Sequence, residues 1–310
     1  MGGDRKRIVV ITGPTAAGKT ALAVDLALAL GGEVVNADSM QVYRHMDVGT
    51  AKPAKEEMRG VPHHLLDVVD PDQPFNAARY RELAAPAVEN ITGAGRACFV
   101  VGGSGLYIRA LLGGLFECPE ASPEVRSRLN QAWEEEGGEA LHKRLGSLDP
   151  DAALGVHPND RVRVLRALEV IELTGRPFSS LAGEHRFRED AFEALKVCLH
   201  MPRERLYERI DARSRAMMEG GLPEETRRLF EKGYSRELKP MQAIGYRHAT
   251  AFLEGAWGRE EAVKRLQADT RRYAKRQMTW FRGESGVLWR SPGDRDLILS
   301  EAAAFLNRHA

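Results

Sequence analysis

Gly13-Pro14-Thr15-Ala16-Ala17-Gly18-Lys19-Thr20 matches the pattern G-x-x-x-x-G-K-[ST]. The β-branched run Ile8–Thr12 precedes this stretch and the helix-forming run Ala21–Leu30 follows it, which is the strand-loop-helix context that the pattern requires. Such a loop closes backbone N–H groups around phosphate oxygens at a helix N-terminus. Lys19 adds a positive charge, and the Thr20 hydroxyl can bind Mg²⁺. The sequence therefore predicts a P-loop for a ligand with linked phosphates, either a nucleoside triphosphate or a small organic diphosphate.

Short apolar runs elsewhere repeat the buried-strand pattern and alternate with helical stretches. They are Val34–Ala37, Ala97–Val101 and, much later, Leu195–His200. This alternation predicts an α/β fold of the P-loop NTPase kind, in which helices cover a parallel sheet.

The texture of the chain changes at about Pro119, where charged helical segments replace strand signals. These segments are interrupted at Gly137-Gly138, Pro150, Pro158 and Gly175-Arg176-Pro177. We therefore expect an all-helical insertion domain at residues 119–190 within a core formed by residues 1–118 and 191–310.

The composition shows no excess of either charge over the whole chain. The 310 residues contain 45 Lys and Arg against 44 Asp and Glu, so any attraction to nucleic acid must be local. Cys98, Cys118 and Cys198 lack pairing or zinc-ligand spacing and are expected to be packing residues in a reducing compartment. No signal peptide or membrane span is predicted, so we expect a cytoplasmic protein.

Asp38 directly follows the predicted strand Val34–Ala37, at the edge where open α/β sheets bind their ligands. It is therefore a candidate general base. The alternative is a helix N-cap, which Asp also fills well. Position alone does not decide between the two.

Arg213 is the unusual residue of the predicted helix Arg203–Glu219. Leu206, Ile210 and Met217 mark a core-facing stripe, and Arg213 lies on it. A buried guanidinium needs an anionic partner, which is either a structural carboxylate or a ligand phosphate.

Ser104 lies in the glycine turn Gly102–Gly105, just before a predicted helix. Helix capping and hydrogen bonding to a substrate are both open to it, and capping is favoured. The pair His63-His64 has no spaced partners, so a structural role is favoured over metal binding.

Residues 259–282 hold eight Lys or Arg against three acids, with Tyr273, Trp280 and Phe281 among them. Basic residues mixed with aromatics suit RNA loops, although a solvated helix face is the simpler alternative. Arg161, Arg163 and Arg166 form a second basic cluster.

Six motifs occur in order from residue 13 to residue 282: GPTAAGKT, DSMQVYR with MDVGTAKP, GGSGLY, RVRVLRALEV, AIGYR and KRQMTWFR. Together they resemble the tRNA dimethylallyltransferases, also called tRNA isopentenyltransferases. The resemblance implies transfer of a dimethylallyl group from dimethylallyl diphosphate to N6 of adenosine 37, next to the anticodon of tRNAs that read codons beginning with U.

The same resemblance assigns roles at the reacting centre. The P-loop would hold the diphosphate instead of ATP, and whether a nucleoside triphosphate also binds there stays open. Asp38 would be the general base, while Lys19 and Arg213 would stabilise the departing diphosphate together with Mg²⁺ at Thr20. We expect a monomer with Mg²⁺ as cofactor and the tRNA anticodon stem-loop as partner, clasped by the insertion domain.

The implied tRNA contacts fall in six segments. They are Asp38, Ser39, Met40 and Gln41; Ser104; Arg126; Val162, Arg163, Val164, Leu165 and Arg166; Gln242, Ala243, Ile244, Gly245, Tyr246 and Arg247; and Lys275, Arg276, Gln277, Met278, Thr279, Trp280, Phe281 and Arg282.

Three positions depart from the usual pattern of the family. Ala17 stands where Ser is common, Ser104 where Thr is frequent, and Val162 where Gln is often found. The aliphatic side chain of Val162 cannot form a hydrogen bond with RNA, so we expect Arg163 and Arg166 to contact the RNA more than Val162 does.

Two other functional classes share part of this pattern. A P-loop kinase for a small metabolite would use the same features up to residue 50 but has no need of the basic C-terminal segment. An RNA-binding protein that uses nucleotide only as a switch would not depend on Asp38.

Overall fold

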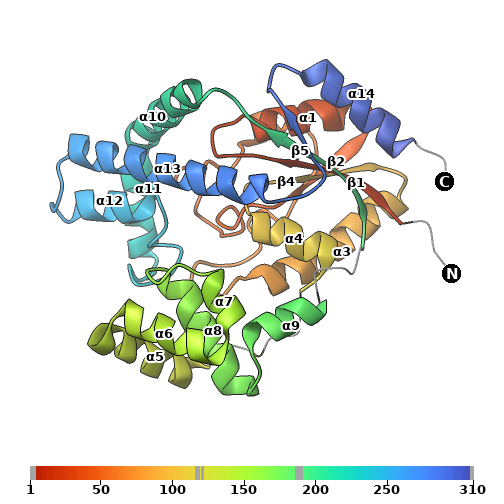
Figure 1. Cartoon of the computed structure of the whole chain (residues 1–310). Helices are drawn as coiled ribbons and strands as arrows, with labels where there is room; N and C mark the ends of the chain where they lie inside the picture. The colour runs from red at the N-terminus through yellow and green to blue at the C-terminus, as the bar shows by residue number, and fades with distance from the viewer. Residues whose placement is uncertain (1–4, 116–118, 120–121, 186–190, 308–310) are drawn as a thin grey trace. The chain divides into compact units, whose positions relative to one another are not determined.

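The computed structural model describes residues 5–115, 119, 122–185 and 191–307 (Figure 1). The chain divides into two compact units. One comprises Met1–Leu112 and Ala191–Ala310, and the other comprises Gly113–Asp190. The smaller unit thus begins at Gly113, whereas the sequence placed its start at residue 119.

A six-stranded sheet forms the centre of the larger unit, in the order β3-β2-β4-β1-β5-β6 with every pair parallel. The strands are β1 (Arg7–Thr12), β2 (Gly32–Asn36), β3 (His63–His64), β4 (Ala97–Val101), β5 (Glu193–Leu199) and β6 (Val287–Arg290). The predicted α/β class is therefore confirmed. The sequence missed β3 and β6, which are the two edge strands.

The helices of the larger unit are α1 (Lys19–Leu30), α2 (Lys55–Met58), α3 (Ala77–Gly93), α4 (Gly105–Gly113), α10 (Arg203–Glu219), α11 (Leu222–Glu231), α12 (Tyr246–Leu253), α13 (Arg259–Arg282) and α14 (Arg295–Leu306). Helices α1, α3 and α14 pack against this sheet. Figure 1 shows α14 beside α1, and Ile298 and Phe305 of α14 share one core cluster with Leu22 and Leu26 of α1.

The arrangement of the strands decides where a site can form. The parallel strands β1, β2 and β4 end at Thr12, Asn36 and Val101 on the same edge of the sheet. The loops that follow them are the P-loop, the segment that begins at Asp38, and the glycine turn Gly102–Gly105. Three motifs that are far apart in sequence therefore meet at one edge.

The smaller unit is helical throughout its described residues. It contains α5 (Pro123–Glu136), α6 (Gly138–Leu148), α7 (Pro150–Leu154), α8 (Arg161–Thr174) and α9 (Phe178–His185) around a core that includes Leu129, Leu141 and Leu168. The predicted breaks coincide with helix ends. Gly137 (φ 83°) separates α5 from α6, and Gly175 (φ 68°) ends α8 in a left-handed conformation that glycine adopts without strain.

Candidate active site

The P-loop is anchored by close backbone packing. A side chain at Gly13 would lie 2.6 Å from the carbonyl oxygen of Leu199, so only glycine fits there. Gly18 adopts φ 93° and leads into α1. The methyl group of Ala17 is buried in the sheet core, where a serine hydroxyl would also face away from the ligand side. The departure from the family pattern at this position is therefore a packing matter.

A cavity of about 740 Å³ lies over this edge of the sheet, and its lining residues all belong to the larger unit. Its ionisable lining residues include Lys19, Asp38, Glu57, Arg209, Arg213, Arg247 and Arg276. Its apolar lining includes Val34, Met40, Leu66, Val101, Ile210, Met217 and Leu266. A cavity lined by both cationic and apolar side chains can take a ligand that joins an anion to a hydrocarbon group.

Lys19 is held against its own loop. Its Nζ donates to the carbonyl oxygens of Gly13 and Pro14 at 3.1 and 2.8 Å. Burial lowers the pKa of Lys19 to about 8; nearby Asp38 opposes this shift and Arg213 adds to it. An arriving anion would favour the charged amine, so the ligand and the lysine stabilise each other.

Arg213 faces the same cavity. Its Nη1 donates to Thr15 Oγ1 at 3.3 Å, and burial lowers its pKa. Among the described residues no carboxylate forms an ion pair with Arg213, so the structural-carboxylate alternative is wrong. What the guanidinium meets is the P-loop, where a ligand anion would lie.

The buried stripe of α10 differs from the predicted one. The buried residues are Leu206, Ile210, Ser214 and Met218, while Arg213 and Met217 are half-buried and line the cavity. At 100° per residue, Arg213 lies about 20° from Leu206, so it shares the predicted face, where it is half-buried and lines the cavity.

Asp38 closes a turn with one oxygen of its carboxylate. Its Oδ1 accepts hydrogen bonds from the backbone N–H groups of Met40 and Gln41, at 2.8 and 3.3 Å. No helix begins here, so the carboxylate closes a turn and not a helix N-terminus. Within the described part of the chain no donor bonds Oδ2. One oxygen thus orients the carboxylate and the other is available for proton transfer in the cavity.

Ser104 ties two of the three loops together. Its Oγ accepts from the backbone N–H of Ser39 at 3.0 Å, which links the glycine turn to the Asp38 segment. The favoured expectation of helix capping by this side chain is therefore wrong. A hydroxyl with this bond can still donate its own hydrogen to a substrate.

Gln277 of α13 ties the same turn to the P-loop. Its Oε1 accepts from the Thr15 N–H at 2.8 Å, and its Nε2 donates to the Gly103 carbonyl at 3.0 Å. Only 6% of Gln277 is exposed. Gln277 also lines the cavity, so its implied tRNA contact stays a prediction, although both polar groups of its side chain are already bonded inside the protein.

Glu225 of α11 is a site residue that the sequence analysis missed. Its carboxylate accepts from the backbone N–H groups of Asp47, Val48 and Gly49 at 3.0, 2.8 and 3.0 Å, and from the Tyr246 hydroxyl at 2.7 Å. Residues 49–51 line the cavity. A glutamate on a short amphipathic helix carries no local signal for such a distant role.

Tyr246 completes this anchor. Its ring is fully buried, and a side chain at Gly49 would lie 2.5 Å from it. Burial and the Glu225 carboxylate raise the pKa of Tyr246. The implied tRNA contact is therefore wrong for Tyr246, and the buried Gly245 beside it is also a packing position.

The other residues of the larger unit that were implied to contact tRNA differ in how exposed their side chains are. The cavity lining includes Ser39, Met40, Gln41, Gln242, Ala243, Ile244, Arg247 and Arg276. Lys275, Thr279 and Arg282 are exposed on α13 and Met278 is half-buried. Phe281 is buried, which makes its implied contact wrong. Trp280 lies against Gly105 and under the Arg109 guanidinium, 4.4 Å from its ring centroid.

In the smaller unit, a buried glutamate organises the basic cluster. Glu169 of α8 is 1% exposed; its Oε1 pairs with Arg126 at 3.0 Å and its Oε2 with Arg166 at 2.6 Å. Both arginines remain partly exposed.

The other implied contacts in the smaller unit lie on α8. Arg163 and Val162 are exposed and Leu165 is half-buried. Val164 is fully buried, so its implied tRNA contact is wrong.

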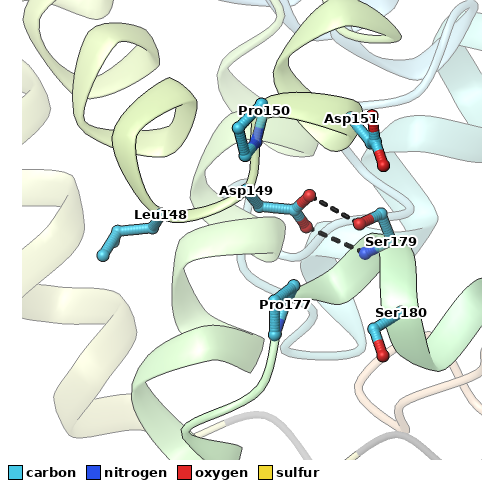
Figure 2. A pocket seen from close by; sticks show the side chains of 7 residues that line it. All are labelled: Leu148, Asp149, Pro150, Asp151, Pro177, Ser179 and Ser180. Carbon is cyan, nitrogen blue, oxygen red and sulfur yellow. Dashed lines mark hydrogen bonds between the residues drawn. The ribbon is translucent and has the colours of Figure 1, made fainter.

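A second cavity of about 310 Å³ lies in the smaller unit around Asp149 (Figure 2). The carboxylate accepts from Ser179 Oγ and N at 2.6 and 2.8 Å and from the Ala152 N–H at 3.1 Å. Burial opposes ionisation, yet these bonds hold the pKa of Asp149 below its usual value. Because both oxygens are occupied in joining α7 to α9, Asp149 is structural.

Metal-binding side chains do not cluster in the part of the chain that the structure describes. His63 Nδ1 bonds the Val61 carbonyl and His64 Nε2 bonds Glu33, which agrees with the structural role favoured for this pair. Cys98 and Cys198 are buried, as expected, and Cys118 lies outside the described residues. No described helix has the length and apolar content needed to cross a membrane.

Comparisons with known proteins agree with this geometry. A family model described as IPP transferase matches residues 41–284. A protein named tRNA dimethylallyltransferase from Geobacter metallireducens is 49% identical over 303 residues, which covers 97% of this chain and 98% of the relative. A relative of the same name from Desulfosudis oleivorans is 50% identical, over 92% of this chain and 91% of its own length.

Solved structures give the same result. The full-length tRNA isopentenylpyrophosphate transferase of Bacillus halodurans is 41% identical with a TM-score of 0.71, over 98% of this chain and 97% of that one. A eukaryotic dimethylallyltransferase acting on tRNA is 29% identical with a TM-score of 0.77, over 96% of this chain and 78% of that one. The chain therefore belongs to the IPP transferase family.

Proposed function

We propose that this protein transfers the dimethylallyl group of dimethylallyl diphosphate to N6 of adenosine 37 in tRNAs that read codons beginning with U. The products are N6-(dimethylallyl)adenosine and diphosphate. The observation that carries the proposal is the joint lining of one cavity by the cations Lys19 and Arg213 and the carboxylate of Asp38. Membership of the IPP transferase family supports this reading over a metabolite kinase.

The leaving group explains the cations. As the bond between the allylic carbon and the diphosphate oxygen breaks, its electron pair stays with the diphosphate. Lys19 and Arg213, already buried beside the loop, stabilise that growing negative charge more strongly than water would. The positive charge that develops on the carbon spreads over the allyl group, so stabilising the anion is the main catalytic task.

Mg²⁺ is the expected cofactor, and the residues present fit it. Thr20 lines the cavity next to Lys19 and offers one hydroxyl oxygen, which suits an ion that usually keeps waters and binds substrate phosphates. Bound there, the ion would neutralise part of the diphosphate charge.

Asp38 serves the nucleophile. The exocyclic amine of adenine is weakly nucleophilic because its lone pair is delocalised into the ring. As N6 forms its bond to the allylic carbon, one N6 proton moves to Oδ2 of Asp38, while Oδ1 keeps the carboxylate oriented through Met40 and Gln41.

The target base must leave its stack to reach this cavity. Residues 39–41 and 242–244 line the cavity and are proposed to contact the extruded adenosine. The exposed cations Lys275 and Arg282 on α13, with Arg276, are proposed to bind the tRNA backbone. Arg126, Arg163 and Arg166 of the smaller unit are proposed to bind the anticodon stem.

The test is a transfer assay without ATP. Purified protein, Mg²⁺ and labelled dimethylallyl diphosphate are incubated with unmodified tRNA that has adenosines at positions 36 to 38. We expect label in the RNA, and none in the same tRNA with guanosine at position 37. Incorporation that requires ATP, or no incorporation at all, contradicts the proposal.

A further inference from the structure

Helix α10 presents a second arginine to the cavity. Arg209 precedes Arg213 by four residues, one turn of the helix, so the two side chains project from the same face. Both line the cavity above the P-loop. Neither the sequence motifs nor the family resemblance drew attention to Arg209.

The two guanidinium groups lie over different parts of the P-loop. Arg213 contacts the Thr15 hydroxyl early in the loop. A Cβ atom at Gly18 would lie 3.7 Å from Nη2 of Arg209, which puts that guanidinium against the last glycine of the loop. The backbone N–H of this glycine and those of Lys19 and Thr20 begin α1, where a phosphate is bound best.

The charges around this point are unbalanced. Lys19, Arg209 and Arg213 line the same cavity, and the nearby Arg213 contributes to the lowered pKa of Lys19. In residues 5–115, 119, 122–185 and 191–307, no carboxylate forms an ion pair with Arg209. The carboxylates Asp38 and Glu57 also line the cavity, but the three cations outnumber them and favour a ligand with more than one negative charge.

We propose that Arg209 is a further binding residue for the diphosphate group, which its planar guanidinium meets from the Gly18 end of the P-loop while Arg213 meets it from the Thr15 end. Two arginines in this arrangement can each offer paired N–H donors to phosphate oxygens. The inference rests on the proposed function, because it extends the same diphosphate site.

The test measures the binding of inorganic pyrophosphate to the full chain by calorimetry, in the presence of Mg²⁺. Arg209→Ala should weaken binding by about 10-fold or more, a loss typical of a charge-assisted hydrogen bond. Arg209→Lys keeps the positive charge but loses the planar guanidinium with its paired N–H donors, so its pyrophosphate affinity should lie between those of Arg209→Ala and the wild type. The matched control is Arg205→Ala, an exposed arginine one turn earlier that does not line the cavity. It should stay within about 2-fold of the wild type.

Two results would overturn the assignment. If Arg209→Ala binds pyrophosphate as tightly as Arg205→Ala does, Arg209 is not a diphosphate ligand. If Arg209→Ala keeps its pyrophosphate affinity but loses tRNA affinity, the guanidinium serves the RNA instead. If the wild type transfers label and Arg209→Ala gives either result, only this inference is overturned. If the wild type neither binds pyrophosphate nor transfers label, the proposed function is contradicted as well.

Discussion

Replacing Glu225 by alanine should destabilise the larger unit and disorder the loop that walls the cavity. The carboxylate accepts four hydrogen bonds, three from backbone N–H groups of residues 47–49 and one from Tyr246. Hydrogen bonds to a charged group contribute about 1.5–3 kcal/mol each. Asp47, Val48 and Gly49 are at least partly exposed, so water can replace the carboxylate there, whereas the buried Tyr246 hydroxyl cannot be rescued as easily. Counting only the Tyr246 bond gives a loss of about 1.5–3 kcal/mol in the free energy of unfolding.

Urea unfolding followed by circular dichroism measures this loss. Glu224→Ala is the matched control, because Glu224 is the preceding residue on α11 but is exposed. It should change the free energy of unfolding by less than about 0.5 kcal/mol. Glu225→Gln keeps one acceptor oxygen and should cost less than Glu225→Ala, since Tyr246 can turn its hydroxyl to accept from the new amide. Equal unfolding curves for Glu225→Ala and Glu224→Ala would refute the anchor.

Four further outcomes follow from the site. Burial disfavours the charged amine of Lys19, so its acylation, measured by mass spectrometry, should increase with pH with a midpoint near pH 8. Pyrophosphate should move that midpoint to higher pH because it stabilises the protonated amine, and an unmoved midpoint would contradict this. Asp38→Asn keeps the turn-closing oxygen, so kcat should fall by about 100-fold to 10,000-fold with pyrophosphate affinity nearly unchanged; an unchanged kcat removes the general base. Gln277→Ala strands the Thr15 N–H and should cost about 1–3 kcal/mol in urea unfolding, and a change below about 0.5 kcal/mol would show that this link is dispensable. The affinity for tRNA should fall steeply with salt if residues 259–282 bind phosphates, and a flat profile in a filter-binding titration would make them a solvated face.

Local patterns explain what could be predicted of the fold. The strand before the P-loop, the strand before Asp38 and the strand at 97–101 are runs of apolar residues bounded by turn signals, and each is present in the structure. The edge strands β3 and β6 have two and four residues, and their pairing depends on neighbours that are distant in sequence. A periodicity argument has too few positions to detect them.

The same distinction applies to the site. Lys19 and Asp38 were found because a motif or a strand end marks them locally. Glu225 is separated in sequence by 176 to 178 residues from the loop residues to which it is hydrogen-bonded, and Gln277 is separated from Thr15 by 262 residues. No pattern of sequence spacing therefore connects either pair. Arg213 was found because a charged residue on the apolar face of a predicted helix is unusual, and the structure places it half-buried in the lining of the cavity.

The implied tRNA contacts show a further limit of motif reasoning. A motif marks a segment, but within a helix only some side chains reach the surface. Val164, Tyr246 and Phe281 belong to such segments and are buried, so their side chains support their neighbours instead of meeting RNA. Burial, which the sequence did not reveal at these positions, separates the two groups.

The central claim is that the P-loop holds the diphosphate of an alkyl donor. The most direct measurement is the ratio of diphosphate released to prenyl groups found on tRNA, taken in one reaction with dimethylallyl diphosphate and Mg²⁺ and without ATP. The account predicts one diphosphate for each modified adenosine, with both products lost together in Lys19→Ala. Diphosphate release without modified adenosine, or modification that appears only when ATP is added and consumed, would contradict it.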